Sequence, residues 1–165
     1  MFRIGDQVIY SSHGVCNIVD LECRLIDGKE VIYLVLSPTG QGNGRFLVPA
    51  GNPKAMSKVK PLLSKPELEA LLNSEEVRQY PWIREDNLRK QKYRELIGSC
   101  DRENLAAMVY ALYRHREQQT AAGKKCHLCD ENFLRDAEKL LISEISVVMD
   151  MEPDDAKQYL RQRLK

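Results

Sequence analysis

The spacing of apolar residues changes near Pro61, and this change divides the chain into a β part and a helical part. Before Pro61, short runs of β-branched and apolar residues alternate with tight turns, and no helical run separates them. After it, apolar residues recur at the three- and four-residue intervals of amphipathic helices. We therefore predict an α+β chain of two domains, residues 1–60 and 61–165.

The first sixty residues contain four strand-like runs, at 7–10, 15–25, 31–36 and 45–48. An Asp27-Gly28 pair separates the second run from the third and is a strong hairpin signal. Short strands joined by turns form antiparallel structures, so we expect a small antiparallel sheet or barrel with a thin core.

The second part of the chain predicts about five helices. A capping box opens the first, with Ser64 and Glu67 flanking Pro66. A basic helix is expected over about 84–97 and a third begins after Asp101. A long amphipathic helix over about 130–149 and a last helix opening at Pro153 follow.

Motifs typical of enzymes do not occur in this sequence. It has neither a phosphate-binding Walker loop nor a Gly-x-Ser-x-Gly elbow, and its three histidines lie in different expected elements. We therefore expect no enzymatic activity and no cofactor. No run approaches the roughly 18 apolar residues of a membrane helix, and no signal peptide opens the chain, so we expect a cytoplasmic protein without membrane contact.

Cys126 and Cys129 form a Cys-x-x-Cys pair, which two chemistries could use: half of a zinc site, or a redox pair. A structural zinc needs four ligands, and no second pair with matching spacing follows. We interpret these residues as the loop that leads into the long helix and predict no metal site, with zinc as the minor hypothesis.

Trp82 is the only tryptophan, and it stands beside a basic segment. From Trp82 to Arg94 there are five basic and two acidic residues, whereas the net charge of the whole chain is only +1. A lone tryptophan is often a packing anchor. An apolar wedge next to cations is also the composition that enters a DNA minor groove and unstacks a base step. The sequence is compatible with both interpretations.

The N-terminal residues carry a family resemblance. The run from Phe2 to Tyr10 followed by His13-Gly14-Val15, the hairpin with Tyr33-Leu34-Val35-Leu36 and the closing Leu47-Val48-Pro49-Ala50 resemble the RNA-polymerase-interacting module. CarD/CdnL regulators and the transcription-repair coupling factor share this module. The helical part resembles CarD too, in Trp82 followed by Arg84, a basic helix, and the residues around Gly98. No helicase motif is present, so the chain resembles the free-standing regulator.

The resemblance implies a Tudor-like β fold that binds the RNA polymerase β subunit. Arg24 matches a basic contact position; the second contact position is Leu47 here, and the nearest arginine is Arg45. Trp82 matches the tryptophan that wedges into the minor groove of promoter DNA at the upstream edge of the melted region. Arg84 and the following helix, with Arg89 and Lys90, match the region that contacts the DNA backbone.

Two other functions stay open on the sequence alone. In the first, the chain is a protein-interaction adaptor, with Trp82 as a hot spot for another protein. Salt dependence separates this from DNA binding, because phosphate contacts weaken steeply with salt. The second, a zinc or thiol enzyme, depends on Cys126 and Cys129 alone.

Overall fold

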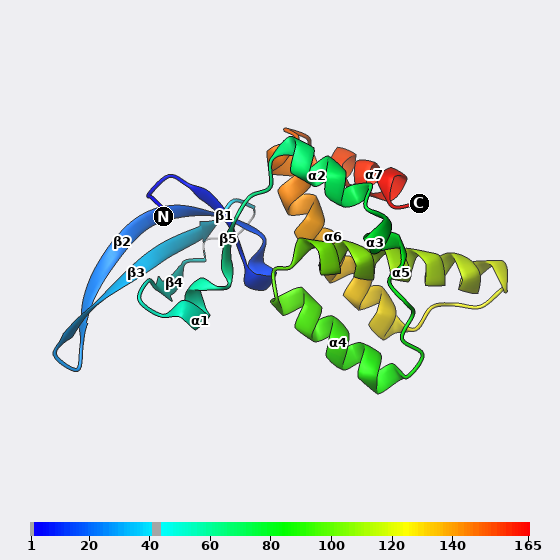
Figure 1. Cartoon of the computed structure of the whole chain (residues 1–165), viewed down its shortest axis with the longest axis horizontal. Coiled ribbons are helices and arrows are strands. Elements are labelled where there is room, and N and C mark those ends of the chain that lie inside the picture. Colours follow the sequence, from blue (N-terminus) through cyan, green and yellow to red (C-terminus); the bar gives the residue numbers. More distant parts are fainter. Residues whose placement is uncertain (1, 41–43) are drawn as a thin grey trace. The chain divides into compact units, whose positions relative to one another are not determined.

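A computed structural model describes residues 2–40 and 44–165 of the chain. The structure contains two compact units, Met1–Leu62 and Leu63–Lys165, and each is described by itself (Figure 1). The first unit is built on a sheet and the second is helical, which confirms the predicted α+β class.

Five antiparallel strands form the sheet of the first unit, in the order β4-β3-β2-β1-β5. These are β1 (Gln7–Tyr10), β2 (Val15–Ile26), β3 (Lys29–Pro38), β4 (Phe46–Pro49) and β5 (Val59–Pro61). The first four match the predicted runs. The short β5 was not predicted, because three residues are too few to show an alternating pattern.

A long hairpin of β2 and β3 extends beyond the rest of the sheet (Figure 1). Asp27 and Gly28 form its turn with φ angles of 50° and 77°. Positive φ at both central residues is what a type I′ turn needs, and the Asp-Gly pair supplies it. The pairing of the two strands shifts register between Ile18 and Asp20, a β-bulge that changes which residues share a face.

The core of this unit is small. Its buried side chains are Val8, Cys16, Ile18, Leu34, Leu36, Val48 and Val59. Helix α1 (Pro53–Met56), which was not predicted, packs Ala55 and Met56 against them. Asn52 caps this single turn by accepting hydrogen bonds from the backbone N–H groups of Lys54 and Ala55.

Six helices make up the second unit: α2 (Lys65–Leu72), α3 (Glu75–Arg78), α4 (Asp86–Gly98), α5 (Arg102–Ala121), α6 (Leu128–Val148) and α7 (Pro153–Arg163). The predicted starts are confirmed for α2, where Ser64 and Glu67 form the capping box, and for α5, which Asp101 caps. Within the part of the chain that the structure describes, no helix is long and apolar enough to cross a membrane.

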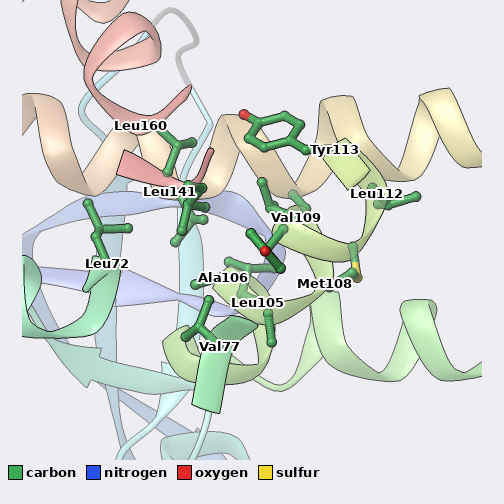
Figure 2. Close-up of a cluster of buried hydrophobic side chains, with 14 of the residues drawn as sticks. Leu72, Val77, Leu105, Ala106, Met108, Val109, Leu112, Tyr113, Leu141 and Leu160 are labelled. Atoms are coloured by element: carbon green, nitrogen blue, oxygen red, sulfur yellow. The ribbon is translucent and has the colours of Figure 1, made fainter. Parts of the chain in front are cut away.

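Helix α5 lies at the centre of the helical core and packs against α6 (Figure 1). Figure 2 shows its side chains Leu105, Val109 and Leu112 together with Leu72 of α2, Val77 of α3, Leu141 of α6 and Leu160 of α7. Nine consecutive residues of α5, 105–113, are buried, so this helix contacts neighbours on most of its surface. It therefore provides a rigid support for side chains at its edges.

A buried carboxylate connects the start of this unit to two of its helices. Glu144 of α6 is 2% exposed and accepts a hydrogen bond from the backbone N–H of Leu63 at 2.8 Å. It also accepts two from the guanidinium of Arg102 at 3.2 Å. A buried charge of this kind is tolerated because it is paired and hydrogen-bonded.

Candidate nucleic-acid interface

Trp82 lies in the short segment between α3 and α4, and Pro81 restricts the backbone just before it. The indole stacks on the imidazole of His115, which α5 provides: the ring centroids are 3.8 Å apart and the planes differ by 9°. Trp82 is partly buried and packs against the helical core. It is thus neither fully exposed nor a fully buried anchor, and its orientation is fixed by contacts within this unit.

His115 is the contact that sequence reasoning missed. Burial lowers the pKa of His115 below its ordinary value, opposed by the charge of Asp130 and aided by that of Arg89. This shift favours the neutral imidazole, which supports the indole as a flat ring. The sequence carried no signal for this pair, since 33 positions separate the two residues.

Arg89 of α4 is buried, in contrast to the expectation that it contacts DNA phosphate. Its guanidinium is 3% exposed and donates two hydrogen bonds to Asp130 of α6, at 2.8 and 3.0 Å. It also donates to the carbonyl oxygen of Ile83 and pairs with Asp86. Burial alone would lower the pKa of Arg89, but the hydrogen bonds and charges of Asp130 and Asp86 raise it overall, so the group stays positively charged.

The same arginine also holds the tryptophan. The guanidinium carbon of Arg89 lies 4.6 Å from the centroid of the Trp82 ring, within the range of a cation–π contact. Because a buried, doubly paired guanidinium cannot reach a phosphate without breaking these bonds, we assign Arg89 to positioning Trp82. Asp130, in the first turn of α6, holds the guanidinium of Arg89 in this position.

The other cations of the basic segment remain accessible to an anionic partner. Arg84, two residues beyond Trp82, is exposed, and so is Lys92 of α4; Lys90 is partly exposed. Arg94 is exposed as well, but it lies farther along α4. These four cations all lie between residues 84 and 94, whereas the net charge of the whole chain is only +1.

The residues predicted to contact polymerase lie in the first unit. Arg24 of β2 pairs across the hairpin with Val31, and Leu47 of β4 pairs with Val35. Residues 31, 33 and 35 of β3 point to one face, and directly paired residues share a face. Arg24, Tyr33 and Leu47 are therefore on the same face of the sheet, opposite the core residues Leu34 and Val48.

Two details of this face differ from a plain basic patch. The Arg24 guanidinium is bonded to Glu22, at 2.8 Å for the shorter contact, and lies 5.9 Å from the Tyr33 ring centroid. Leu47 is 37% exposed, so the second contact position that the resemblance implies carries an exposed apolar side chain. Arg45 is exposed but precedes the first residue of β4, so it is next to the strand and not within it.

Cys126 is partly buried and Cys129 is exposed, at the start of α6. Burial, followed by the charge of Glu131, raises the pKa of the Cys126 thiol, which disfavours the thiolate that metals and redox chemistry use. Among residues 2–40 and 44–165, no three or more His, Cys, Asp or Glu side chains are grouped so that they could hold a metal ion.

Comparison with known protein families gives two matches. Residues 2–60 match the family model described as the CarD-like/TRCF RID domain. Residues 68–161 match the model described as the CarD C-terminal domain. The first match covers the sheet unit, and the second covers the helical unit with Trp82, His115 and Arg89.

Proposed function

Because the chain belongs to the CarD family of RNA polymerase-interacting transcription regulators, we propose that it stabilises the open promoter complex through Trp82. In this proposal the sheet unit binds the β subunit of RNA polymerase. The helical unit carries the indole to the DNA minor groove at the upstream edge of the melted region. The observation that supports it best is the immobilised indole, stacked on His115 and held by Arg89 next to exposed cations.

A wedge has to be rigid to be useful. Separating two stacked base pairs costs a few kcal/mol. A side chain that must also lose its own rotamer freedom on binding would add to this cost. His115 and Arg89 hold the Trp82 ring before DNA arrives, so less entropy is lost on insertion. The part of the indole that stays exposed is the surface available to a base step.

The effect on transcription follows from differential affinity. Closed and open complexes are in equilibrium, and a protein that contacts only the distorted junction shifts that equilibrium toward the open form. The indole makes no base-specific hydrogen bonds in a wedge of this kind, so selectivity should follow how easily a base step deforms. Arg84 and Lys90 would add contacts to the DNA backbone that do not depend on sequence.

Attachment to polymerase would compensate for weak DNA binding. The net charge of +1 gives the chain no strong attraction to DNA, and Arg89 is already neutralised by Asp130 and Asp86. Binding to the β subunit through the face that bears Arg24 and Leu47 would raise the effective concentration of Trp82 at the junction.

The experiment compares Trp82→Ala with the intact chain on a promoter complex. Trp82→Ala should shorten the lifetime of the open complex at least tenfold, if the indole supplies about 1.4 kcal/mol or more in that state. Binding to polymerase should not change. The lifetime is measured after a competitor that traps free polymerase is added.

Two controls keep the result interpretable. Trp82 packs against the core, so circular dichroism and urea unfolding must show that the variant is folded at the assay temperature. Leu88→Ala removes an exposed apolar side chain, 52% accessible, from the following helix α4 and should leave the lifetime unchanged. An unaltered lifetime with folded, polymerase-bound Trp82→Ala would exclude the wedge.

A further inference from the structure

A pocket of about 220 Å³ opens beside Trp82 in the helical unit. Besides the indole and His115, its walls include Tyr80, Tyr110 of α5 and two arginines, Arg78 of α3 and Arg114 of α5. The volume is far above the ~10–15 Å³ that one water molecule requires, so the pocket accommodates a larger polar group. Neither arginine was a predicted site residue.

None of the described residues that line this pocket carries a carboxylate. In the part of the chain that the structure describes, neither Arg78 nor Arg114 forms an ion pair with an acidic side chain. Arg89, which also contacts Trp82, has two carboxylate partners instead. The uncompensated positive charge next to the indole is therefore inside the pocket.

The structure holds both arginines in place by contacts with neutral groups. Arg78 donates to the backbone oxygens of Ser74 and Arg163, at 3.0 and 2.6 Å, and Arg114 donates to the hydroxyl of Tyr110 at 3.2 Å. Both guanidinium carbons lie 5.9 Å from the Tyr110 ring centroid. A guanidinium has five N–H donors, so each keeps donors for an anion.

Fixed guanidinium groups between aromatic rings have the chemistry of a phosphate-ester site. Arginine binds phosphate oxygens through paired hydrogen bonds, and aromatic faces pack against sugars and bases. We propose that this pocket binds a phosphate group of the DNA strand adjacent to the base step that Trp82 enters, with Arg114 and Arg78 as its ligands. This inference rests on the proposed function, because it needs DNA at Trp82.

Arg114→Gln tests the pocket more directly than a substitution of Arg78. Arg114 is exposed and its hydrogen bond is to a tyrosine hydroxyl, whereas Arg78 joins α3 to the end of α7 and its loss could disturb the fold. Arg116→Gln, two residues along α5, makes the same charge change outside the pocket and is the matched control. Arg114→Lys keeps the charge but loses the paired geometry.

The first measurement is the affinity of the purified chain for forked DNA, over a series of salt concentrations. Arg114→Gln should weaken binding about tenfold, as expected for loss of a charged hydrogen bond. It should also reduce the slope of log affinity against log salt by roughly one phosphate contact, about 0.9. Arg116→Gln should change neither, and Arg114→Lys should fall between. Unchanged affinity and slope for Arg114→Gln would overturn the inference.

A second measurement identifies the source of the phosphate. Trp82 is the only tryptophan and lines the pocket, so its fluorescence reports occupancy. Titration with a deoxynucleoside monophosphate should give no saturable response where forked DNA does. Tight, Arg114-dependent binding of the free nucleotide would overturn the assignment to DNA.

The same variants separate this inference from the proposed function. If Trp82→Ala shortens the open-complex lifetime while Arg114→Gln leaves DNA binding unaltered, the wedge stands and the phosphate site fails. If Arg114→Gln weakens DNA binding while Trp82→Ala leaves the lifetime unchanged, the wedge fails, and the assignment of the phosphate to a base step that Trp82 enters fails with it.

Discussion

Arg89 illustrates at the level of one residue how a basic segment divides into structural and surface charges. Five cations between Trp82 and Arg94 suggest a solvated, DNA-facing helix. Arg89 instead points inward, because Asp130 of α6 is 2% exposed and needs a positive partner. An unpaired carboxylate in that position would carry a large desolvation penalty.

Arg89→Ala should therefore lower the free energy of unfolding by about 3–5 kcal/mol, because it leaves Asp130 buried without a partner. Lys90→Ala, at a partly exposed neighbouring position, should lie within about 0.5 kcal/mol of the intact chain. Urea unfolding followed by Trp82 fluorescence measures both values. Equal stability of the two variants would mean that the Arg89–Asp130 pair does not contribute.

A double replacement tests whether the unpaired carboxylate of Asp130 causes the loss of stability. Changing Arg89→Met together with Asp130→Leu removes both charges, so no buried carboxylate is left behind. This variant should be more stable than Arg89→Ala alone. It would still lose the cation beside Trp82. The effect of that loss on the indole can therefore be measured in a variant that has no unpaired buried carboxylate.

At the level of elements, strand pairing decides which side chains of the first unit form one surface. The bulge between Ile18 and Asp20 resets the register of β2, and after it Arg24 and Glu22 share a face with Tyr33 and Leu47. Without the bulge, the residues beyond it would point to the other side. This surface therefore depends on an irregularity that the alternating pattern did not reveal.

Arg24→Glu reverses the charge in the middle of that face and should weaken binding to the polymerase β subunit at least tenfold. Lys54→Glu in α1 makes the same change at an exposed position outside the face and is the control. Pull-down with purified β subunit, followed by titration, measures the difference. Equal recovery of the two variants would place the interface elsewhere.

At the level of the whole chain, two separate cores allow two separate activities. The sheet and the helices each have their own buried cluster. In the proposed function, one unit binds polymerase and the other binds DNA. The activity then depends on the covalent connection between them.

Separating the units should preserve folding and remove most of the activity. A fragment of residues 63–165 should unfold cooperatively in urea, since it contains the complete helical core. It should prolong the open complex only at concentrations far above those at which the intact chain acts, because the local concentration is lost. A fragment as potent as the intact chain would contradict attachment through the sheet unit.

Much of this architecture could be predicted from local signals. Alternating apolar residues gave four of the five strands, the Asp27-Gly28 turn gave the hairpin, and Ser64 and Asp101 marked two helix starts. Each of these signals lies within a few residues and is governed by backbone preferences and local hydrogen bonds. The neighbours of Trp82 and the family resemblance marked it as a candidate site residue, and its role stays a prediction.

Only the tertiary structure decided what surrounds Trp82. His115 comes from 33 positions away, Asp130 pairs with Arg89 over 41 positions, and Arg114 reaches the pocket from α5. A single sequence shows which residues are cationic, but not which of them meets a buried carboxylate and which lines an uncompensated pocket. That choice is made by helix packing, because burial favours paired charges and leaves the unpaired ones where water or an anion can reach them.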